Sequence, residues 1–201
     1  MPGSIHCELV SWERFHALAR QLALSISRAS FRPDLIVAIG RGGYLPARMV
    51  SDYLGIYDLA EFRIEHYRGV HKERVARVRY PLTAEITGKR VLLIDDVNDS
   101  GDTLDAAIRH LQERGESGAL ATAVLHHKTV SSLRPDFYAE EVREWRWIIY
   151  PWAVMEDLRS LLHGMEPPPA SVEAFARLLR ERHGIEAGRQ TLEDVLTMAP
   201  D

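Results

Sequence analysis

The stretch Val91-Leu-Leu-Ile-Asp-Asp-Val-Asn-Asp-Ser-Gly-Asp-Thr-Leu104 determines the fold that we expect for this chain. Its apolar beginning, residues 91–94, is too short and too rich in β-branched residues for a helix. It suits a strand buried on both faces, as in a parallel sheet. Asp95 and Asp96 then stand at the carboxyl end of that strand, where open α/β sheets place their ligands. With a helix expected over residues 102–114, the stretch predicts a strand, a loop and a helix.

The loop Asp99-Ser-Gly-Asp-Thr103 offers backbone amides and two hydroxyls that can surround an anion, and the following helix adds its amino-terminal dipole. Beside two carboxylates, this cradle suits a phosphorylated sugar. The amides would hold the phosphate, while Asp95 and Asp96 would hold ribose hydroxyls directly or through Mg²⁺. A simpler interpretation is that acids after a strand only cap the next helix, which suits one Asp better than this whole cluster. A phosphoaspartate phosphatase would need Asp-x-Asp-x-Thr, but Val97 and Asn98 stand two residues beyond the two acids.

This stretch resembles the phosphoribosyl pyrophosphate (PRPP) motif of type I phosphoribosyltransferases. The resemblance implies that Ser100, Gly101, Asp102 and Thr103 form the site for the 5′-phosphate of PRPP. Members of the family usually carry Thr where Ser100 stands, and Ser keeps the hydroxyl. They often carry a small residue where Asp102 stands. Asp102 adds a negative charge that would oppose phosphate binding unless its side chain turns outward, for instance to cap the helix.

Composition and length describe an ordinary globular chain of 201 residues with a formal charge of -4. That charge gives no general attraction for nucleic acid. Cys7 is the only cysteine, so no internal disulfide can form, which is consistent with a reducing cytoplasm. No basic-then-apolar leader and no run of about 18 apolar residues occurs, so we expect a cytoplasmic protein without a membrane partner.

The pattern of apolar residues and breakers predicts a mainly parallel, five-stranded α/β sheet flanked by helices. A helix over residues 11–29 would be capped by Ser11, and a helix over residues 45–54 would be closed by Gly55. Further strands are expected over residues 35–39, 60–67 and 119–127, and further helices over 172–183 and 190–198. We expect a domain over residues 1–166 that includes a small hood at about 129–156, followed by a helical extension over residues 167–201.

The first strand ends in Gly40-Arg-Gly-Gly43, and a helix follows. A dinucleotide-binding loop would need a third glycine where Leu45 stands. On spacing alone, a tight structural turn is at least as good an explanation as a ligand loop. The segment Ala38-Ile-Gly-Arg-Gly-Gly-Tyr-Leu-Pro-Ala47 is, however, similar to the pyrophosphate loop of 6-oxopurine phosphoribosyltransferases. This similarity implies that Arg41, Gly42 and Gly43 hold the pyrophosphate of PRPP, and an arginine fork suits that anion.

Residues 66–80 carry five Arg or Lys against one Glu, and the alternation over residues 73–80 predicts a β-ribbon arm. Three interpretations stay open. The arm could be a solvated hairpin. It could be a lid over PRPP, since the family has a flexible segment at this place in the chain. It could also contact RNA, although one basic stretch is weak support for that role.

Two further segments resemble the base-binding parts of the same family. Leu125-His-His-Lys128 looks like the segment from which related enzymes project an amine to the 6-oxygen of a purine, although a lysine there is commonly a solvated strand end. Trp147-Ile-Ile-Tyr-Pro-Trp152 resembles a segment of bacterial and archaeal xanthine-guanine and hypoxanthine phosphoribosyltransferases. By that resemblance Trp147 stacks on the purine, while the backbone at Trp147 and Ile148 meets its pyrimidine edge. Asp99 would be the catalytic residue, accepting the N7 proton as N9 attacks.

The resemblance implies a Mg²⁺-dependent transfer of 5-phosphoribose from PRPP to a 6-oxopurine, with Asp95 and Asp96 as the metal or ribose ligands. Hypoxanthine, guanine and xanthine share the 6-oxygen, so the sequence does not choose among them. Homodimers are usual in such families. Two alternatives stay open: a regulator of the same fold that senses PRPP or nucleotides and binds nucleic acid through the arm, and an enzyme for another base such as adenine or orotate.

Overall fold

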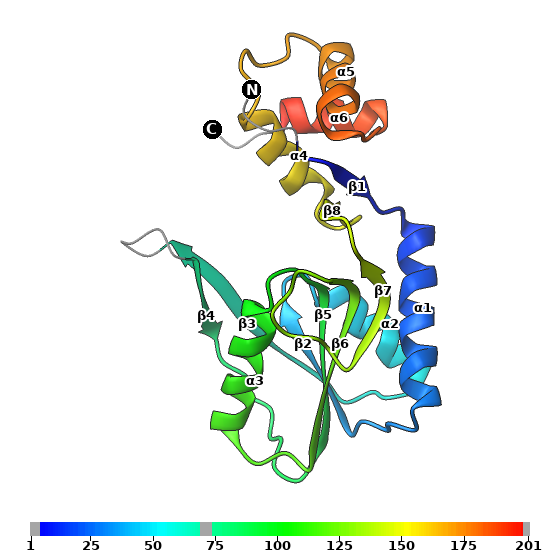
Figure 1. Ribbon diagram of the computed structural model, residues 1–201, viewed down its shortest axis with the longest axis vertical. Coiled ribbons are helices and arrows are strands. Elements are labelled where there is room, and N and C mark those ends of the chain that lie inside the picture. Colours follow the sequence, from blue (N-terminus) through cyan, green and yellow to red (C-terminus); the bar gives the residue numbers. More distant parts are fainter. Residues whose placement is uncertain (1–4, 69–73, 199–201) are drawn as a thin grey trace. The chain divides into compact units, whose positions relative to one another are not determined.

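The computed structural model describes residues 5–68 and 74–198 (Figure 1). The strands in this part of the chain are β1 (Cys7–Leu9), β2 (Leu35–Gly40), β3 (Leu59–Arg68), β4 (Arg74–Tyr80), β5 (Arg90–Asn98), β6 (Ala119–Lys128), β7 (Phe137–Val142) and β8 (Trp147–Ile149). The helices are α1 (Trp12–Arg28), α2 (Tyr44–Leu54), α3 (Asp102–Arg114), α4 (Val154–His163), α5 (Val172–His183) and α6 (Arg189–Thr197). The helices and strands expected from the sequence are present. Their ends lie within about two residues of the predicted ones, except that β5 continues four residues beyond the predicted 91–94.

The main sheet of the described residues has the strand order β4-β3-β2-β5-β6-β7. The five neighbouring strands β3, β2, β5, β6 and β7 pair in parallel. Strand β4 pairs antiparallel with β3 and forms one edge of the sheet. Each residue of β2 is buried, as the apolar run 35–39 predicted for a strand covered on both faces. The expectation of a mainly parallel α/β sheet is therefore confirmed. The expected number of five strands is corrected to six among the described residues, because β4 of the arm pairs along β3 and joins the sheet.

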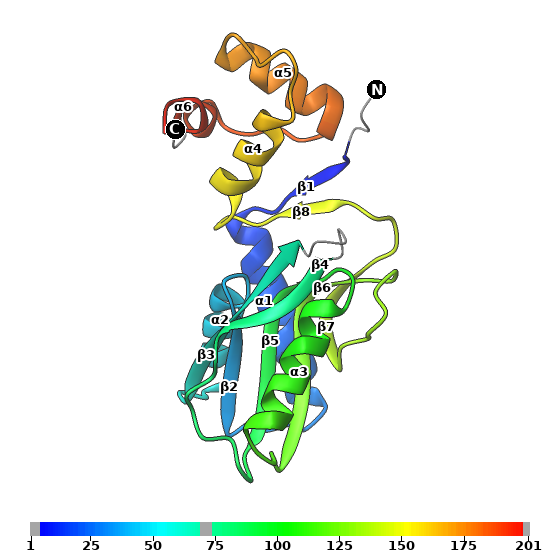
Figure 2. The ribbon, with the colours of Figure 1, turned by 90° about the vertical axis from the view of Figure 1, so that its left-hand side faces the viewer.

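Helices cover both faces of this sheet. Figure 2 shows α3 on one face and α1 with α2 on the other. Leu35, Val37 and Ile39 share a buried core with Leu104 and Ala107 of α3. The three-and-four spacing of apolar residues on α1 predicts a buried stripe, and five of its six members are buried: Phe15, Leu18, Ala19, Leu22 and Ile26. The sixth, Trp12 at the start of the helix, is 56% exposed. Ser11 caps α1 by accepting the Arg14 amide at 3.1 Å, and Gly55 ends α2 with a φ of 66°.

Strand β5 is longer than its apolar run. It continues through the acidic residues to Asn98, so that Asp95 lies within the strand instead of after it. The neighbouring strand β6 explains this extension, because Asp95 pairs with Val124 and Asn98 pairs with His127. Backbone pairing with β6 therefore keeps the acidic segment in an extended conformation at the carboxyl end of β5.

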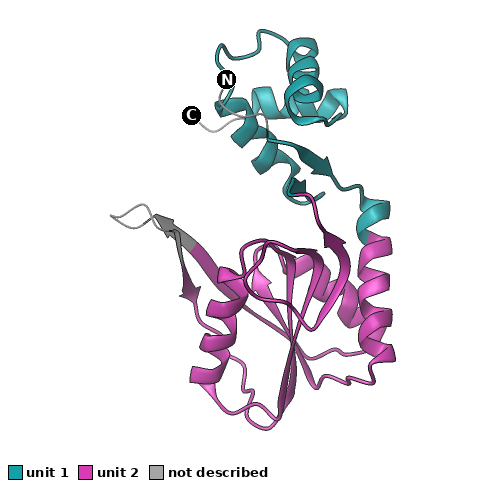
Figure 3. Cartoon of the chain, in the orientation of Figure 1, with its two compact units in different colours: residues 1–15, 145–201 teal, residues 16–144 magenta. Residues whose placement is uncertain are grey.

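The chain forms two compact units, which Figure 3 colours separately: residues 16–144, which contain the main sheet, and residues 1–15 with 145–201. In the second unit β1 pairs in parallel with β8, so that Cys7 lies opposite Trp147. Helices α4, α5 and α6 share a core with these strands. Ser171 caps α5 by accepting the Ala174 amide at 3.2 Å, and Gly184 ends it with a φ of 72°. The boundary at residue 166 stays a prediction.

Candidate active site at the carboxyl ends of the parallel strands

The glycine loop after β2 lies against the acidic end of β5. The two strands are neighbours, with Ala38 opposite Ile94, so their carboxyl ends share one edge of the sheet. A side chain at Gly42 would place its Cβ 2.4 Å from Oδ2 of Asp96. A Cβ at Gly43 would lie 2.4 Å from the carbonyl oxygen of Ile94. Glycine lets the loop approach the Asp96 carboxylate at position 42 and the backbone of β5 at position 43 this closely.

Asp95 and Asp96 have different surroundings. Asp95 is 7% exposed, while Asp96 is half-buried. The Asp96 amide donates to the Asp95 carboxylate at 2.9 Å, and the Val97 amide donates to the Asp96 carboxylate at 2.7 Å. Burial, together with the nearby charge of Asp96, raises the pKa of Asp95 well above its ordinary value. This pair therefore suits a ligand that brings positive charge or hydroxyl donors.

The proposed phosphate loop opens helix α3. Gly101 caps the helix with a φ of 100°, a conformation that favours glycine. The Ser100 hydroxyl donates to the Asp102 carboxylate at 2.9 Å and accepts the Asp102 amide at 3.3 Å. Asp102 is exposed, and its carboxylate thus engages a hydroxyl that the resemblance assigns to phosphate binding. Thr103 is half-buried in the first turn of the helix.

A second loop, the one that follows β6, anchors this phosphate loop. The amide and the hydroxyl of Ser132 both donate to the Ser100 carbonyl, at 3.0 and 2.9 Å. Asn98 is 2% exposed, and its amide nitrogen donates to the Leu133 carbonyl at 2.6 Å and lies 3.2 Å from Nδ1 of His127. The Ser131 hydroxyl donates to the Asn98 side-chain oxygen at 3.1 Å. Satisfied buried polar groups of this kind fix the loop geometry.

Sequence reasoning missed this anchor. In the sequence, Asn98 was considered only because it does not fit a phosphatase motif. Ser131 and Ser132 belong to no motif that would have marked them as functional. Their partners are distant in sequence, so no local pattern could have found them.

Lys128 and Asp99 form an ion pair. The Lys128 ammonium donates to Oδ2 of Asp99 at 2.9 Å, and the lysine side chain is only 2% exposed whereas that of Asp99 is 38% exposed. Strands β5 and β6 bring the two residues together, because Asn98 lies opposite His127 in their register. Lys128 is therefore not a solvated strand end. The structure brings together the two residues of this unit that the resemblance assigns to the purine.

Trp147 and Ile148 belong to the other unit, on strand β8. Ile148 is 6% exposed and Trp147 is 38% exposed. The Trp147 indole nitrogen donates to Oδ1 of Asp157 on α4 at 3.0 Å. Trp152 packs among aromatic rings, stacked on Tyr150 at 4.9 Å and edge-to-face with Phe15 at 4.9 Å. Trp152 therefore has a packing role in this unit.

The basic arm is a β-ribbon, as predicted, because β4 pairs antiparallel with β3 from Tyr80 to Arg74. Its tip, residues 69–73, lies outside the described residues. The three interpretations of the arm stay open.

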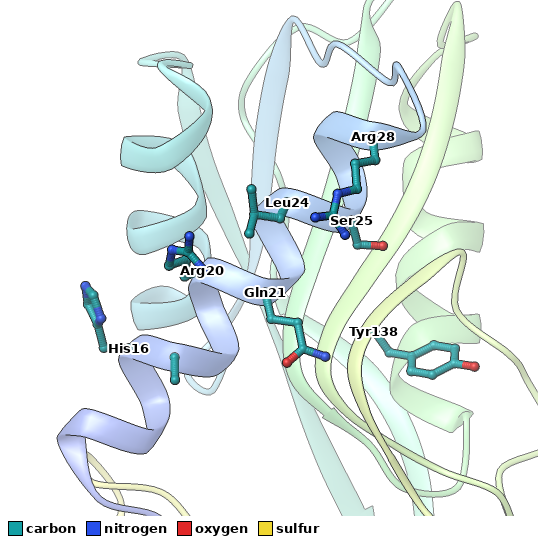
Figure 4. A pocket seen from close by; sticks show the side chains of 8 residues that line it. His16, Arg20, Gln21, Leu24, Ser25, Arg28 and Tyr138 are labelled. Carbon is teal, nitrogen blue, oxygen red and sulfur yellow. The ribbon is translucent and has the colours of Figure 1, made fainter.

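A pocket of about 630 Å³ lies along α1, as Figure 4 shows. Its lining comes from successive turns of that helix and from Tyr138 of β7, and it includes Arg20, Gln21 and Arg28. None of the predicted site residues lines it. The chemistry therefore points to the strand ends and not to this pocket.

Comparison with known proteins identifies the family of the chain. Residues 8–157 match the family model described as the phosphoribosyl transferase domain. The chain belongs to this family. Among curated proteins, the xanthine-guanine phosphoribosyltransferase of Gluconobacter oxydans is 29% identical over 155 residues, which cover 75% of this chain and 87% of that protein. The phosphoribosyl transferase match ends within α4, so the chain continues beyond it through α5 and α6.

Two solved structures resemble this phosphoribosyl transferase domain. A purine phosphoribosyltransferase from Pyrococcus horikoshii has a TM-score of 0.65 and 27% identity, covering 74% of this chain and 94% of that one. A hypothetical protein from Neisseria gonorrhoeae with bound ppGpp has a TM-score of 0.64 and 28% identity, covering 74% of this chain and 89% of that one.

Among the described residues, no helix has the length and apolar character needed to cross a membrane.

Proposed function

We propose that this protein transfers 5-phosphoribose from PRPP to a 6-oxopurine in purine salvage. In the reaction the bond from the anomeric carbon to pyrophosphate breaks, a bond from that carbon to N9 of the purine forms, and pyrophosphate leaves. The observation that carries the proposal is the phosphate loop and the acid pair at one sheet edge, with the Lys128–Asp99 pair on the adjoining strands. The family match and the names of the similar proteins support the same reaction.

In this proposal the phosphate loop holds the 5′-phosphate through Ser100, Gly101 and Thr103, with the dipole of α3 aligned to favour the anion. Asp95 and Asp96 orient the ribose hydroxyls. The Arg41–Gly43 loop holds the departing pyrophosphate, and its contact with Asp96 keeps it close to the sugar. Bond breaking builds positive charge on the ribose, which the neighbouring carboxylates stabilise.

The residues also fit Mg²⁺. This ion commonly takes one or two carboxylates and completes its shell with water and substrate phosphate oxygens. The half-buried Asp96 and the adjacent Asp95 supply such carboxylates, while the residues described contain no cluster of three or more His, Cys, Asp or Glu side chains that could hold a metal alone. When bound with PRPP, Mg²⁺ would neutralise charge on the leaving pyrophosphate.

Lys128 and Asp99 would contact different atoms of the base: Lys128 the 6-oxygen and Asp99 the N7 position. An ammonium donates to the 6-oxygen of hypoxanthine, guanine or xanthine but meets only another donor at the amino group of adenine. Asp99 would accept the N7 proton as N9 attacks, a general-base contribution of about 10²–10⁴-fold. Because the two side chains bond each other at 2.9 Å, an entering purine would exchange that ion pair for contacts with its own edge. Trp147 would stack on the ring, and the backbone at Ile148 would meet its pyrimidine edge.

The test is a turnover assay with purified protein, Mg²⁺ and PRPP, challenged separately with hypoxanthine, guanine, xanthine, adenine and orotate. We expect nucleotide and pyrophosphate in equal amounts with at least one 6-oxopurine. Turnover only with adenine or orotate would replace the proposed substrate class. Lys128→Ala should lower kcat/KM for the 6-oxopurine by about tenfold or more, and an unchanged preference would remove Lys128 from base recognition.

A second candidate function is regulation by a guanine nucleotide, favoured by the ppGpp-bound structure from Neisseria gonorrhoeae. The diphosphate groups of ppGpp could occupy the loops that we assign to PRPP. A binding titration with ppGpp, with and without PRPP, tests this candidate. Competition together with turnover would make ppGpp an inhibitor of the enzyme, whereas ppGpp binding without turnover of any base would favour the regulator.

We further propose that the enzyme works in the cytoplasm as a homodimer. Its single cysteine agrees with a reducing compartment. Sedimentation equilibrium would give the oligomeric state directly.

A further inference from the structure

The indole of Trp147 has a specific partner within its own unit. Its N–H donates to Oδ1 of Asp157 at 3.0 Å, and Asp157 lies in the first turn of α4. The Trp147 side chain remains 38% exposed despite this bond. The contact therefore fixes the polar edge of the ring and still leaves surface on which a base could stack.

The pairing of β8 does not by itself orient that ring. Cys7 lies opposite Trp147 in the parallel pair of β1 and β8, which places the main chain. The side chain still has two rotatable bonds, and an immobilised side chain costs about 0.5–1.5 kcal/mol of ordering on binding. A hydrogen bond made before the base arrives would remove part of that cost.

Helix α4, which carries Asp157, is held by the part of the chain beyond the family match. The core of this unit has nine buried members among the described residues, and seven of them come after residue 157. These seven are Leu158, Met165, Phe175, Leu179, Ile185, Leu192 and Val195. The Arg159 guanidinium also donates to the Met198 carbonyl at 2.7 Å, which ties α4 to the end of α6.

We propose that Asp157 is a positioning residue that orients the Trp147 indole for stacking on the purine, and that residues 158–198 support it. The inference rests on the proposed function. By this inference, the part of the chain after the family match at residues 8–157 contributes to the affinity for the base. An ionised carboxylate is the stronger acceptor for an indole N–H. Burial of Asp157, with the charge of Glu156 adding to it, raises its pKa to about 6, so the carboxylate is ionised above neutral pH.

The experiment compares Asp157→Ala with Asp157→Asn in the full chain, measuring KM for the purine, KM for PRPP and kcat at pH 8. Loss of the acceptor should raise the purine KM about five- to tenfold and leave the PRPP KM unchanged. Asn keeps a side-chain oxygen that can accept, so Asp157→Asn should stay within about twofold of the wild type. Glu156→Ala, which changes an exposed neighbour on the same turn, serves as the matched control.

Trp147→Phe supplies the second arm, because it removes the N–H donor without altering α4. Adding Asp157→Ala to Trp147→Phe should change the purine KM no further. An unchanged purine KM in Asp157→Ala, a parallel rise in the PRPP KM, or a full effect in the Trp147→Phe background would overturn the inference. Failure of the proposed function gives a different result, namely a wild-type protein that converts no 6-oxopurine.

Discussion

At the scale of single residues, Asp102 is the member of the phosphate loop whose charge opposes its proposed ligand. Its carboxylate holds the Ser100 hydroxyl at 2.9 Å. We expect Asp102→Ala to release that hydroxyl, remove the charge and lower the KM for PRPP about two- to fivefold. Steady-state kinetics at low and high salt would show the gain shrinking with salt. Asp105→Ala, which removes an exposed carboxylate paired with Arg109, is the control. A higher KM for PRPP in Asp102→Ala would instead make the capping role of Asp102 dominant.

At Gly42 the pyrophosphate loop lies directly against the acid pair of the proposed PRPP site. A Cβ there would lie 2.4 Å from the Asp96 carboxylate, so Gly42→Ala must displace either the loop or the acid. Because a small misplacement of reacting groups is costly, we expect kcat/KM for PRPP to fall about ten- to a hundredfold. In Gly164→Ala the nearest atom would be 3.5 Å away, and the activity should not change. Wild-type kinetics in Gly42→Ala would show that the loop adjusts freely.

At the scale of elements, the loop after β6 supports the phosphate loop through Asn98. We expect Asn98→Leu to leave the Ser131 hydroxyl and the His127 ring without this partner, which costs about 1–3 kcal/mol of unfolding free energy. The PRPP KM should rise as well, because the same contacts hold the Ser100 segment. Urea unfolding followed by far-UV circular dichroism, with kinetics on the same samples, tests both effects. Ser131→Ala removes one of these contacts and should show a smaller loss. Equal stability of Asn98→Leu and wild type would contradict the anchoring role.

The elements also show how far the sequence could predict this structure. Strand β2 follows from a buried apolar run, and helix α3 was expected directly after the Asp99–Thr103 loop; both were predicted within a residue. The pattern also placed the acids and the glycine loop each at the carboxyl end of a predicted strand. The structure shows that these two strands are neighbours, so the acids and the loop lie at one edge of the sheet. Strand β8 is only three residues long, and β7 includes two glutamates, so neither gives a clear period. The Asn98 anchor and the bond to Asp157 join side chains that no local pattern relates, and only the folded chain reveals them.

At the scale of the whole molecule, the distribution of tryptophan gives one of the two units a fluorescence signal of its own. All four tryptophans, at positions 12, 145, 147 and 152, belong to the unit formed by residues 1–15 and 145–201. Tryptophan fluorescence therefore follows that unit, while far-UV circular dichroism follows both. When two units unfold separately, a single transition no longer describes the chain. Asn98→Leu should then shift the dichroism transition and leave the fluorescence transition in place.

The same probe tests how pH acts on the unit that carries the base-stacking residue. Burial raises the pKa of Asp157 to about 6 from its ordinary 3.8, so the folded unit binds this proton more tightly than the unfolded chain. The contribution to stability is complete below about pH 4 and is lost as pH rises through 6. The urea midpoint seen by tryptophan fluorescence should therefore be lower at pH 7.5 than at pH 5. Asp157→Asn cannot titrate, so its midpoint should change less over this range. If the urea midpoint of Asp157→Asn fell as much as that of the wild type between pH 5 and pH 7.5, the pH dependence would belong to another group. The pKa of Asp157 would then be ordinary.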